Sequence, residues 1–159
     1  MSQIQTLLNE YGESHQHPTN KAVHWICVPA IMVSLFGLLW SIPTPAFFHQ
    51  LNWGPVSLNW AIIFMTLAMI YYLRLSVSLA VGMLFVGSFF LFIIYQLSLI
   101  TALPLWAVCL IIFAAAWVGQ FWGHKIEGKK PSFLKDIQFL LIGPVWLLHF
   151  IYGKLGIAY

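Results

Sequence analysis

The chain has 159 residues, of which 61% are hydrophobic and 7% are charged. Soluble domains are about 45–50% apolar and about 25% charged, so this composition excludes a soluble globular protein and predicts an integral membrane protein. The formal net charge of +3 arises mainly from lysines that follow one apolar run, which predicts a membrane-flanking loop and no nucleic-acid partner. This length is typical of one domain, which we expect to comprise residues 1–159.

Along the chain, one amphipathic segment is followed by five apolar runs. The segment 4–15 places Ile4, Leu8 and Tyr11 on one helical face and is too polar to cross a bilayer, so we expect it at the membrane interface or against the bundle. About 20 apolar residues cross a membrane as a helix. The candidate spans are residues 23–42, 58–73, 75–100, 104–123 and 137–152. We therefore predict an all-α integral membrane helical bundle of four to five transmembrane helices plus an N-terminal amphipathic helix.

The last apolar run contains Gly143-Pro144 and leaves two topologies open. Because proline disrupts a helix interior, the run 137–152 either crosses the membrane or dips in and returns. His149 lies near the outer face in the first case and comes back toward the other histidines in the second, so we assign it no role. The preceding residues, 124–136, are expected to form a lysine-rich loop.

The lysine and arginine residues predict the orientation of the chain. With a cytoplasmic N-terminus, Lys21, Arg74 and the lysines of the loop 124–136 all lie inside, whereas the loops 43–57 and 101–103 carry neither residue type. Cytoplasmic loops carry an excess of Lys and Arg, which favours this orientation. The membrane is expected to be the inner membrane in a bacterial cell and the endoplasmic reticulum in a eukaryotic one.

The same orientation brings four histidines to the cytoplasmic side. His15, His17 and His24 lie just before or at the start of the first span, and His124 lies at the end of the fourth, whereas His49 is in an outer loop. Ionisable groups at membrane depth are costly and usually functional, and imidazole is the commonest metal ligand. A turn before the first span would fold His15 back over His24. We therefore predict a metal site formed by His15, His24 and His124.

The residue types leave the metal and several other functions open. Histidines without cysteine suit iron, zinc or copper. The chain lacks the HExxH motif and the multiple histidine boxes of membrane di-iron enzymes, which favours a single metal ion. The alternatives are histidines that form structural hydrogen bonds between helices, a haem with two histidine ligands, and a metal or small-solute transporter, which would need polar groups through the whole membrane depth.

Two segments of the chain carry a family resemblance. Residues 15–29 read HQHPTNKAVHWICVP, and residues 120–131 read QFWGHKIEGKKP. Both resemble the signatures of a family of small membrane proteins that includes fungal 2-hydroxy-fatty-acid dioxygenases. The two segments and Ile142-Gly143-Pro144 occur in the same order as in the family. The resemblance therefore covers nearly the whole chain. The chain differs from the fungal members at Gln16, where they have a histidine, and in a spacing from the second-motif histidine to the acidic residue that is one shorter.

This resemblance implies an Fe(II)-dependent dioxygenase that uses O2 to shorten a long-chain 2-hydroxy fatty acid by one carbon, by α-oxidation at the cytoplasmic membrane face. It implies His15, His24 and His124 as the iron ligands. Another lipid-modifying membrane metalloenzyme remains the main alternative, and a non-catalytic membrane protein is a further one. Membrane lipid is an expected partner, and the sequence does not indicate an oligomeric state.

Six further residues receive expected roles around this site. Gln120 and Glu127 share a helical face with the second-motif histidine and would orient a ligand histidine, and His17 would act as a proton relay. The remaining candidates bind the substrate carboxylate at the interface, where cationic and polar groups attract it. They are Asn20, Lys21 and Lys125.

Overall fold

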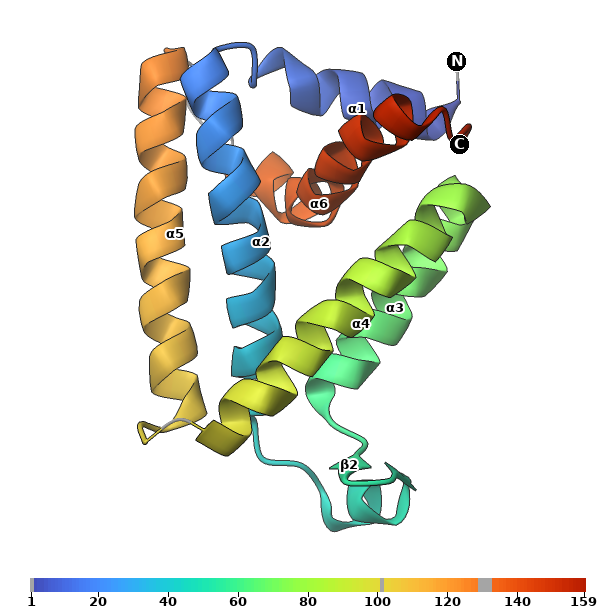
Figure 1. The fold of residues 1–159 in the computed structure, drawn as a ribbon, viewed down its shortest axis with the longest axis vertical. Coiled ribbons are helices and arrows are strands. Elements are labelled where there is room, and N and C mark those ends of the chain that lie inside the picture. Colours follow the sequence, from blue (N-terminus) through green and yellow to red (C-terminus); the bar gives the residue numbers. More distant parts are fainter. Residues whose placement is uncertain (1, 101, 129–132) are drawn as a thin grey trace.

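The computed structural model describes residues 2–100, 102–128 and 133–159, and for residues 53 and 133–138 it describes only the backbone. Six α-helices account for most of these residues (Figure 1). They are α1 (Gln3–Glu13), α2 (Pro18–Trp40), α3 (Trp60–Leu75), α4 (Val77–Ile100), α5 (Leu105–Glu127) and α6 (Phe133–Leu155). A short 3-10 helix, η1 (Ala46–Gln50), and a two-stranded hairpin, β1 (Asn52–Trp53) with β2 (Val56–Ser57), interrupt the expected loop between α2 and α3. The all-helical fold class is confirmed.

Three of the helices, α2, α4 and α5, are long and apolar enough to cross a membrane. Helix α3 and the segment Phe139–Leu155 of α6 are apolar but shorter. The long helices present large apolar side chains outward, among them Ile26, Phe85 and Val118, which are about two-thirds or more exposed. So much exposed apolar surface is unfavourable in water and suits lipid, which supports the predicted membrane class.

Two helices extend about one turn beyond the membrane spans predicted for them. Helix α2 begins at Pro18, because the His17 side chain caps its N-terminus and Pro18 occupies the first helical position, where no N–H is needed. Helix α5 continues to Glu127 and ends at Gly128, whose φ of 73° is the left-handed conformation that glycine adopts at helix ends. His124 is therefore helical, and the expected loop 124–136 starts only at Gly128.

The predicted break at Gly143-Pro144 is wrong, because α6 continues through Pro144. Val145 and Trp146 are buried, and the Trp146 ring packs against Tyr11 of α1, which compensates for the backbone hydrogen bond that proline cannot make. The two chain termini lie beside each other at one end of the molecule (Figure 1). Helix α6 therefore ends at the same end of the molecule as the N-terminus, and the choice between the two membrane topologies of this run stays a prediction.

The six helices form two antiparallel pairs and a third layer, α1 with α6, at one end of the molecule. Helices α2 and α5 run antiparallel side by side, α3 and α4 form a second pair, and α1 and α6 pack together across one end (Figure 1). Glycines allow α2 and α5 to approach closely, because a Cβ at these positions would collide with the facing helix. The facing pairs are Gly37 with Cys109, Gly119 with Cys27, and Gly123 with Asn20.

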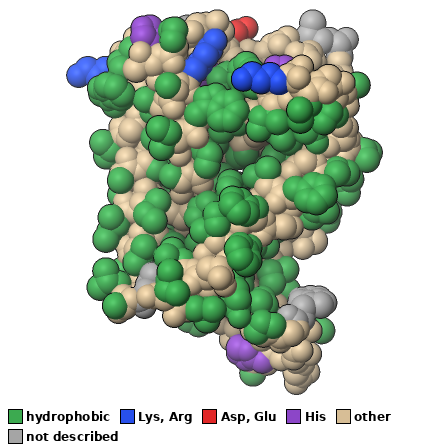
Figure 2. All heavy atoms as spheres, in the orientation of Figure 1, with side chains coloured by type: hydrophobic (Ala, Val, Ile, Leu, Met, Phe, Trp, Pro, Cys, Tyr) green, Lys and Arg blue, Asp and Glu red, His purple; other side chains and the backbone are tan. Residues whose placement is uncertain are grey.

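Charge is distributed unevenly between the two ends of the molecule. On the face shown in Figure 2, the Lys and Arg side chains gather at the end that holds α1 and α6. This grouping is what the orientation argument requires. The side of the membrane on which this end lies stays a prediction.

Candidate metal centre

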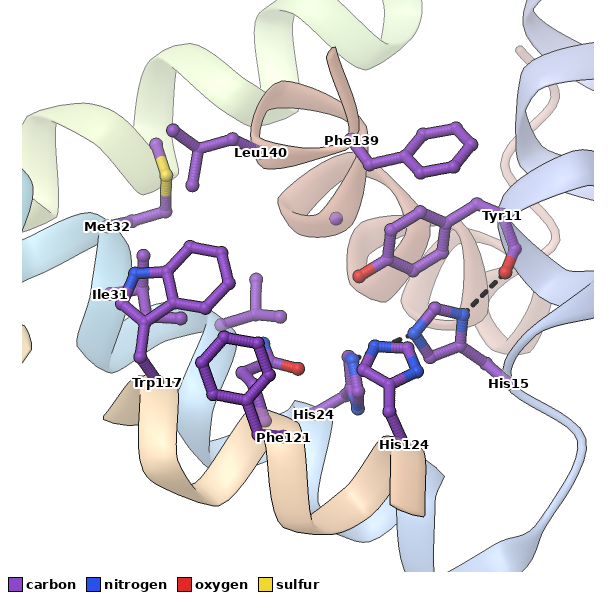
Figure 3. A pocket seen from close by; sticks show the side chains of 13 residues that line it. Tyr11, His15, His24, Ile31, Met32, Trp117, Phe121, His124, Phe139 and Leu140 are labelled. Carbon is purple, nitrogen blue, oxygen red and sulfur yellow. Dashed lines mark hydrogen bonds between the residues drawn. The ribbon is translucent and has the colours of Figure 1, made fainter. Parts of the chain in front are cut away.

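His15, His24 and His124 meet at the end of the α2–α5 pair, below α1 and α6 (Figure 3). His15 comes from the loop between α1 and α2, His24 from the second turn of α2, and His124 from the last turn of α5. One ligand nitrogen from each lies within 4.8 Å of the other two. His15 and His24 are 2% and 1% exposed, and His124 is half-buried, so two of the three rings are enclosed by protein. The three residues that the sequence singled out are thus brought together.

Backbone carbonyls fix the tautomers of His15 and His24. His15 Nδ1 lies within hydrogen-bond distance of the Tyr11 carbonyl oxygen, and His24 Nδ1 lies 2.9 Å from the Asn20 carbonyl oxygen. A carbonyl oxygen can only accept, so each Nδ1 must carry a proton and donate it. In a neutral imidazole the other nitrogen, Nε2, is then an acceptor with a free lone pair.

These two lone pairs face each other, because Nε2 of His15 and Nε2 of His24 are 2.8 Å apart. Two acceptors at this distance need a cation between them, either a shared proton or a metal ion. Burial lowers the pKa of His15 to about 4, so at neutral pH the proton is disfavoured. Ligand histidines in metal sites commonly donate their second N–H to a backbone carbonyl, as both of these do.

The His124 ring completes the cluster from the α5 side. Its centroid lies 5.0 Å from that of His15 and 5.1 Å from that of His24. Its Nδ1 is buried and has no hydrogen-bond partner among the described residues. A buried polar atom without a partner costs about 1–3 kcal/mol, so the His124 ring has a bond to gain from a ligand. Nitrogens on one metal lie roughly 3 Å apart when each metal–nitrogen bond is about 2.1 Å, a spacing the His15–His24 pair already has.

The histidines form the polar end of a pocket whose other walls are almost entirely apolar (Figure 3). Helices α1, α2, α5 and α6 all contribute to it. The remaining lining residues are Tyr11, Val28, Ile31, Met32, Trp117, Gln120, Phe121, Phe139, Leu140 and Gly143. An apolar pocket with a few polar groups at one end suits a ligand with a polar head and an apolar tail.

Gln120 and Glu127 were both expected to orient a ligand histidine, and the structure places only Gln120 at the pocket. Gln120 lines the pocket and its Oε1 is buried without a partner among the described residues, so a role at the site stays a prediction. Glu127 was expected to orient a ligand histidine, but its carboxylate accepts hydrogen bonds from the backbone N–H groups of Gln16, at 2.9 Å, and His17, at 2.8 Å. Glu127 thus holds the loop that carries His15 and not an imidazole ring.

Asn20 was expected to bind substrate, but it lies beneath the same loop. Its side chain is fully buried, and its Nδ2 donates to the Ser14 carbonyl oxygen and to Glu127 Oε2, both at 3.2 Å. It is not among the residues that line the pocket. Asn20 therefore holds the loop before α2, and its position does not support the expected contact with substrate.

The remaining expected residues lie outside the histidine cluster. His17 is exposed, and its Nδ1 accepts from the Thr19 backbone N–H at 3.2 Å, which places the ring at a helix cap and leaves its proton-relay role unsupported. Lys125 is exposed near the end of α5. Lys21 lines a separate polar cleft together with His15 and His149. The substrate-binding roles of the two lysines stay predictions.

The two histidines without an assigned role are also apart from the cluster. His149 forms a hydrogen bond with the Tyr159 hydroxyl group, and His49 is exposed on η1. Neither ring belongs to the three-histidine cluster among the described residues.

Tyr11 is a residue of the site that the sequence reasoning treated only as apolar packing. Its ring stacks on the His15 ring, with centroids 4.2 Å apart and planes 8° from parallel, and its carbonyl fixes the His15 tautomer. The i, i+4 spacing of Tyr11 and His15 was the available signal, because such residues lie on one face of a helical turn. Tyr11 therefore orients His15 through both its ring and its backbone.

Comparison with known proteins gives a family match. The chain matches the model of a family described as "Mpo1-like", 2-hydroxy-palmitic acid dioxygenase Mpo1-like, over residues 1–155. No curated protein and no solved structure gives a match.

Proposed function

The chain belongs to the Mpo1-like family, and from this membership and its three-histidine cluster we propose that it is an Fe(II)-dependent dioxygenase that shortens a long-chain 2-hydroxy fatty acid by one carbon. His15, His24 and His124 are the proposed iron ligands. The family description supports the substrate class, and the cluster supports the metal. A balanced reaction is one 2-hydroxy acid and one O2 giving the acid one carbon shorter, carbon dioxide and water, which needs no added reductant.

The observation that carries this proposal is the pair of facing Nε2 atoms 2.8 Å apart. A purely structural hydrogen bond between His15 and His24 would need a proton on one Nε2, but both rings use their proton at Nδ1. A metal ion satisfies both lone pairs, and the His124 ring offers a third ligand nitrogen within 4.8 Å of the other two. A metal centre thus accounts for the two facing lone pairs and for the third ring beside them.

The donor set suits a catalytic metal. Three neutral imidazoles with no cysteine are compatible with Fe(II), and three protein ligands leave further coordination positions for other ligands, as catalytic sites do. Iron bound there would supply the site at which O2 and the carboxylate and hydroxyl groups of a 2-hydroxy acid come together. The protein itself holds His15 and His24 in one tautomer and buries both rings.

From the residues that line the pocket we infer a position for the substrate. Its polar head would lie at the histidine end, near the Gln120 amide, and its acyl chain would pass along the apolar walls formed by Val28, Ile31 and Phe121 (Figure 3). The walls lie on helices that are apolar on their outer faces, so the acyl chain would reach the pocket from the bilayer. We propose that the whole chain acts as one membrane domain with this site at its cytoplasmic face.

The test is metal analysis and an activity assay on the full chain purified without oxygen. We expect about one iron ion per chain and conversion of 2-hydroxypalmitate with O2 into the acid shorter by one carbon. His49→Ala should retain iron and activity, because this ring is exposed on η1. A folded protein that binds no iron and leaves 2-hydroxypalmitate unchanged would contradict the proposal.

A further inference from the structure

The three histidines are not held in the same way. His24 and His124 project from α2 and α5, whose glycines bring the two helices into close contact. His15 lies in the loop between α1 and α2, where its backbone N–H makes a single turn bond to the Gly12 carbonyl oxygen, at 3.0 Å. A loop residue that must meet two helical residues needs additional contacts to fix its position.

Such contacts exist on both sides of His15. Before it, the Ser14 carbonyl oxygen accepts from Asn20 Nδ2 at 3.2 Å. After it, the Gln16 and His17 backbone N–H groups donate to Glu127 Oε1 at 2.9 Å and Oε2 at 2.8 Å. Asn20 Nδ2 also donates to Glu127 Oε2 at 3.2 Å, which joins the two halves. We refer to Asn20 and Glu127 together as the loop clamp.

The loop clamp is connected to both of the other histidines. Asn20 lies one turn before His24 on α2, and its carbonyl oxygen accepts from His24 Nδ1. Glu127 lies about one turn after His124 on α5. Each clamp residue therefore shares a helical turn with one of the two helical histidines, so the clamp positions the loop relative to both.

The clamp bonds are of a strong type. A carboxylate that accepts N–H groups forms charge-assisted hydrogen bonds, which are roughly twice as strong as neutral ones. The Gln16 and His17 N–H groups lie at the N-terminus of α2, where the helix dipole also favours a negative charge. Glutamine at this position would keep the shape but turn an NH2 group toward a donor, so the second acceptor would be lost.

We infer that Asn20 and Glu127 are positioning residues that set His15 against His24 and His124 for metal binding. The inference rests on the proposed function, because it assumes that the three histidines bind one metal ion. It assigns to the two residues a role different from the catalytic and substrate-binding roles that the sequence suggested. Neither residue needs to contact the substrate or the metal.

The experiment is a Co(II) titration of the full chain in detergent, followed by visible absorption, which reports both affinity and the ligand set. Glu127→Gln should bind Co(II) about 10–100-fold more weakly, as losses of such outer contacts do, and should change the absorption spectrum. Asn20→Asp should give the same result, because aspartate cannot donate to Ser14. The matched control is Gln16→Ala, which removes a side chain and leaves the backbone N–H that Glu127 binds.

Melting of the metal-free proteins separates positioning from general stability. We expect Glu127→Gln to melt within a few degrees of the wild type and of Gln16→Ala while binding Co(II) more weakly. Unchanged affinity and spectrum in Glu127→Gln and Asn20→Asp would overturn the inference. So would a lowered melting temperature with unchanged affinity of the folded fraction.

A wild-type protein that binds no Co(II) would count against the proposed function and would still leave the clamp testable. In that case amide hydrogen exchange of the metal-free protein measures it directly. The clamp predicts faster exchange at the Gln16 and His17 N–H groups in Glu127→Gln than in the wild type. Equal exchange rates would overturn it.

Discussion

The two ends of the molecule treat buried polar groups differently. At the far end, Ser34 donates to carbonyl oxygens of its own helix, and Asn59 caps the first turn of α3, so both are satisfied locally. At the histidine end, the Nε2 atoms of His15 and His24 face each other 2.8 Å apart, and Glu127 accepts from the backbone N–H of Gln16, 111 residues away in the sequence. Buried atoms without a partner among the described residues gather there too. They are Asn20 Oδ1, Gln120 Oε1 and His124 Nδ1. The fourth such atom among the described residues, Tyr71 Oη, lies on α3 and not in this group.

This difference indicates what each end does. Local bonds such as those of Ser34 stabilise one helix and need no further partner. Unpaired buried atoms cost free energy, so each of them calls for an explanation, and a bound ion is one. Their concentration at the histidine end supports the proposed metal site there, whereas the bonds of Ser34 and Asn59 stabilise helices only.

The largest expected effect separates the two ends directly. His24→Ala should abolish metal binding and lower activity by at least about 10³-fold, because it removes one of two facing ligand nitrogens. Ser34→Ala, on the same helix, should leave metal content and activity near wild type. Metal analysis and turnover of the two variants would check this, and equal metal content in both would contradict the comparison.

The next effect tests the pocket beside the histidines. In Gly143→Ala the new Cβ would lie 3.0 Å from Tyr11 Oη and 3.4 Å from Val28 Cγ1, which narrows the pocket wall. We expect kcat/KM for a long-chain substrate to fall about tenfold with metal content unchanged, since one methyl group in a pocket is worth about 1–3 kcal/mol.

The control for this change lies on the same helix. A Cβ at Gly153 meets nothing within 4 Å, so Gly153→Ala should leave kcat/KM unchanged. If both alanine variants lost the same activity, the effect would belong to helix α6 as a whole and not to the pocket.

A smaller effect is expected at the far end, and on stability alone. In Gly37→Ala the added Cβ would collide with the Cys109 side chain between α2 and α5. Overpacking of this kind costs about 1–3 kcal/mol, so the melting temperature should fall while the folded protein keeps its metal. Metal loss in a folded Gly37→Ala protein would show that the two ends are not separable.

The smallest effect concerns His17. Its side chain caps α2, and losing a cap of this type costs about 1 kcal/mol. His17→Ala should therefore melt slightly earlier and keep nearly full activity. A loss of activity greater than about tenfold without loss of metal would restore the proton-relay role that its exposed position argues against.

The sequence predicted the membership of the histidine cluster better than its surroundings. Charge distribution placed His15, His24 and His124 on one side of the membrane, and the helical spacing of His124 with Glu127 placed both on one face of α5. Glu127 and Asn20 were identified, but their roles were not. Their partners are backbone groups of the loop, and a backbone N–H has no signature in the sequence.

The helix boundaries illustrate the same limit. Pro144 predicted a break in the last run, and the packing of Trp146 against Tyr11 of α1, a tertiary contact, overrides it. The start of α2 was predicted too late, because Pro18 was taken as a turn residue and not as the first residue of a helix. Local signals give the element types, and packing decides where the elements end.

X-ray absorption at the iron edge of the iron-loaded full chain tests most directly whether the three histidines bind one iron ion. We predict three histidine nitrogens at roughly 2.0–2.2 Å from this ion, as first-row metal–imidazole bonds are. In His24→Ala the remaining iron should show fewer histidine neighbours or be absent. Iron with no histidine neighbours in the wild type, or a folded wild-type protein that takes up no iron, would contradict this prediction.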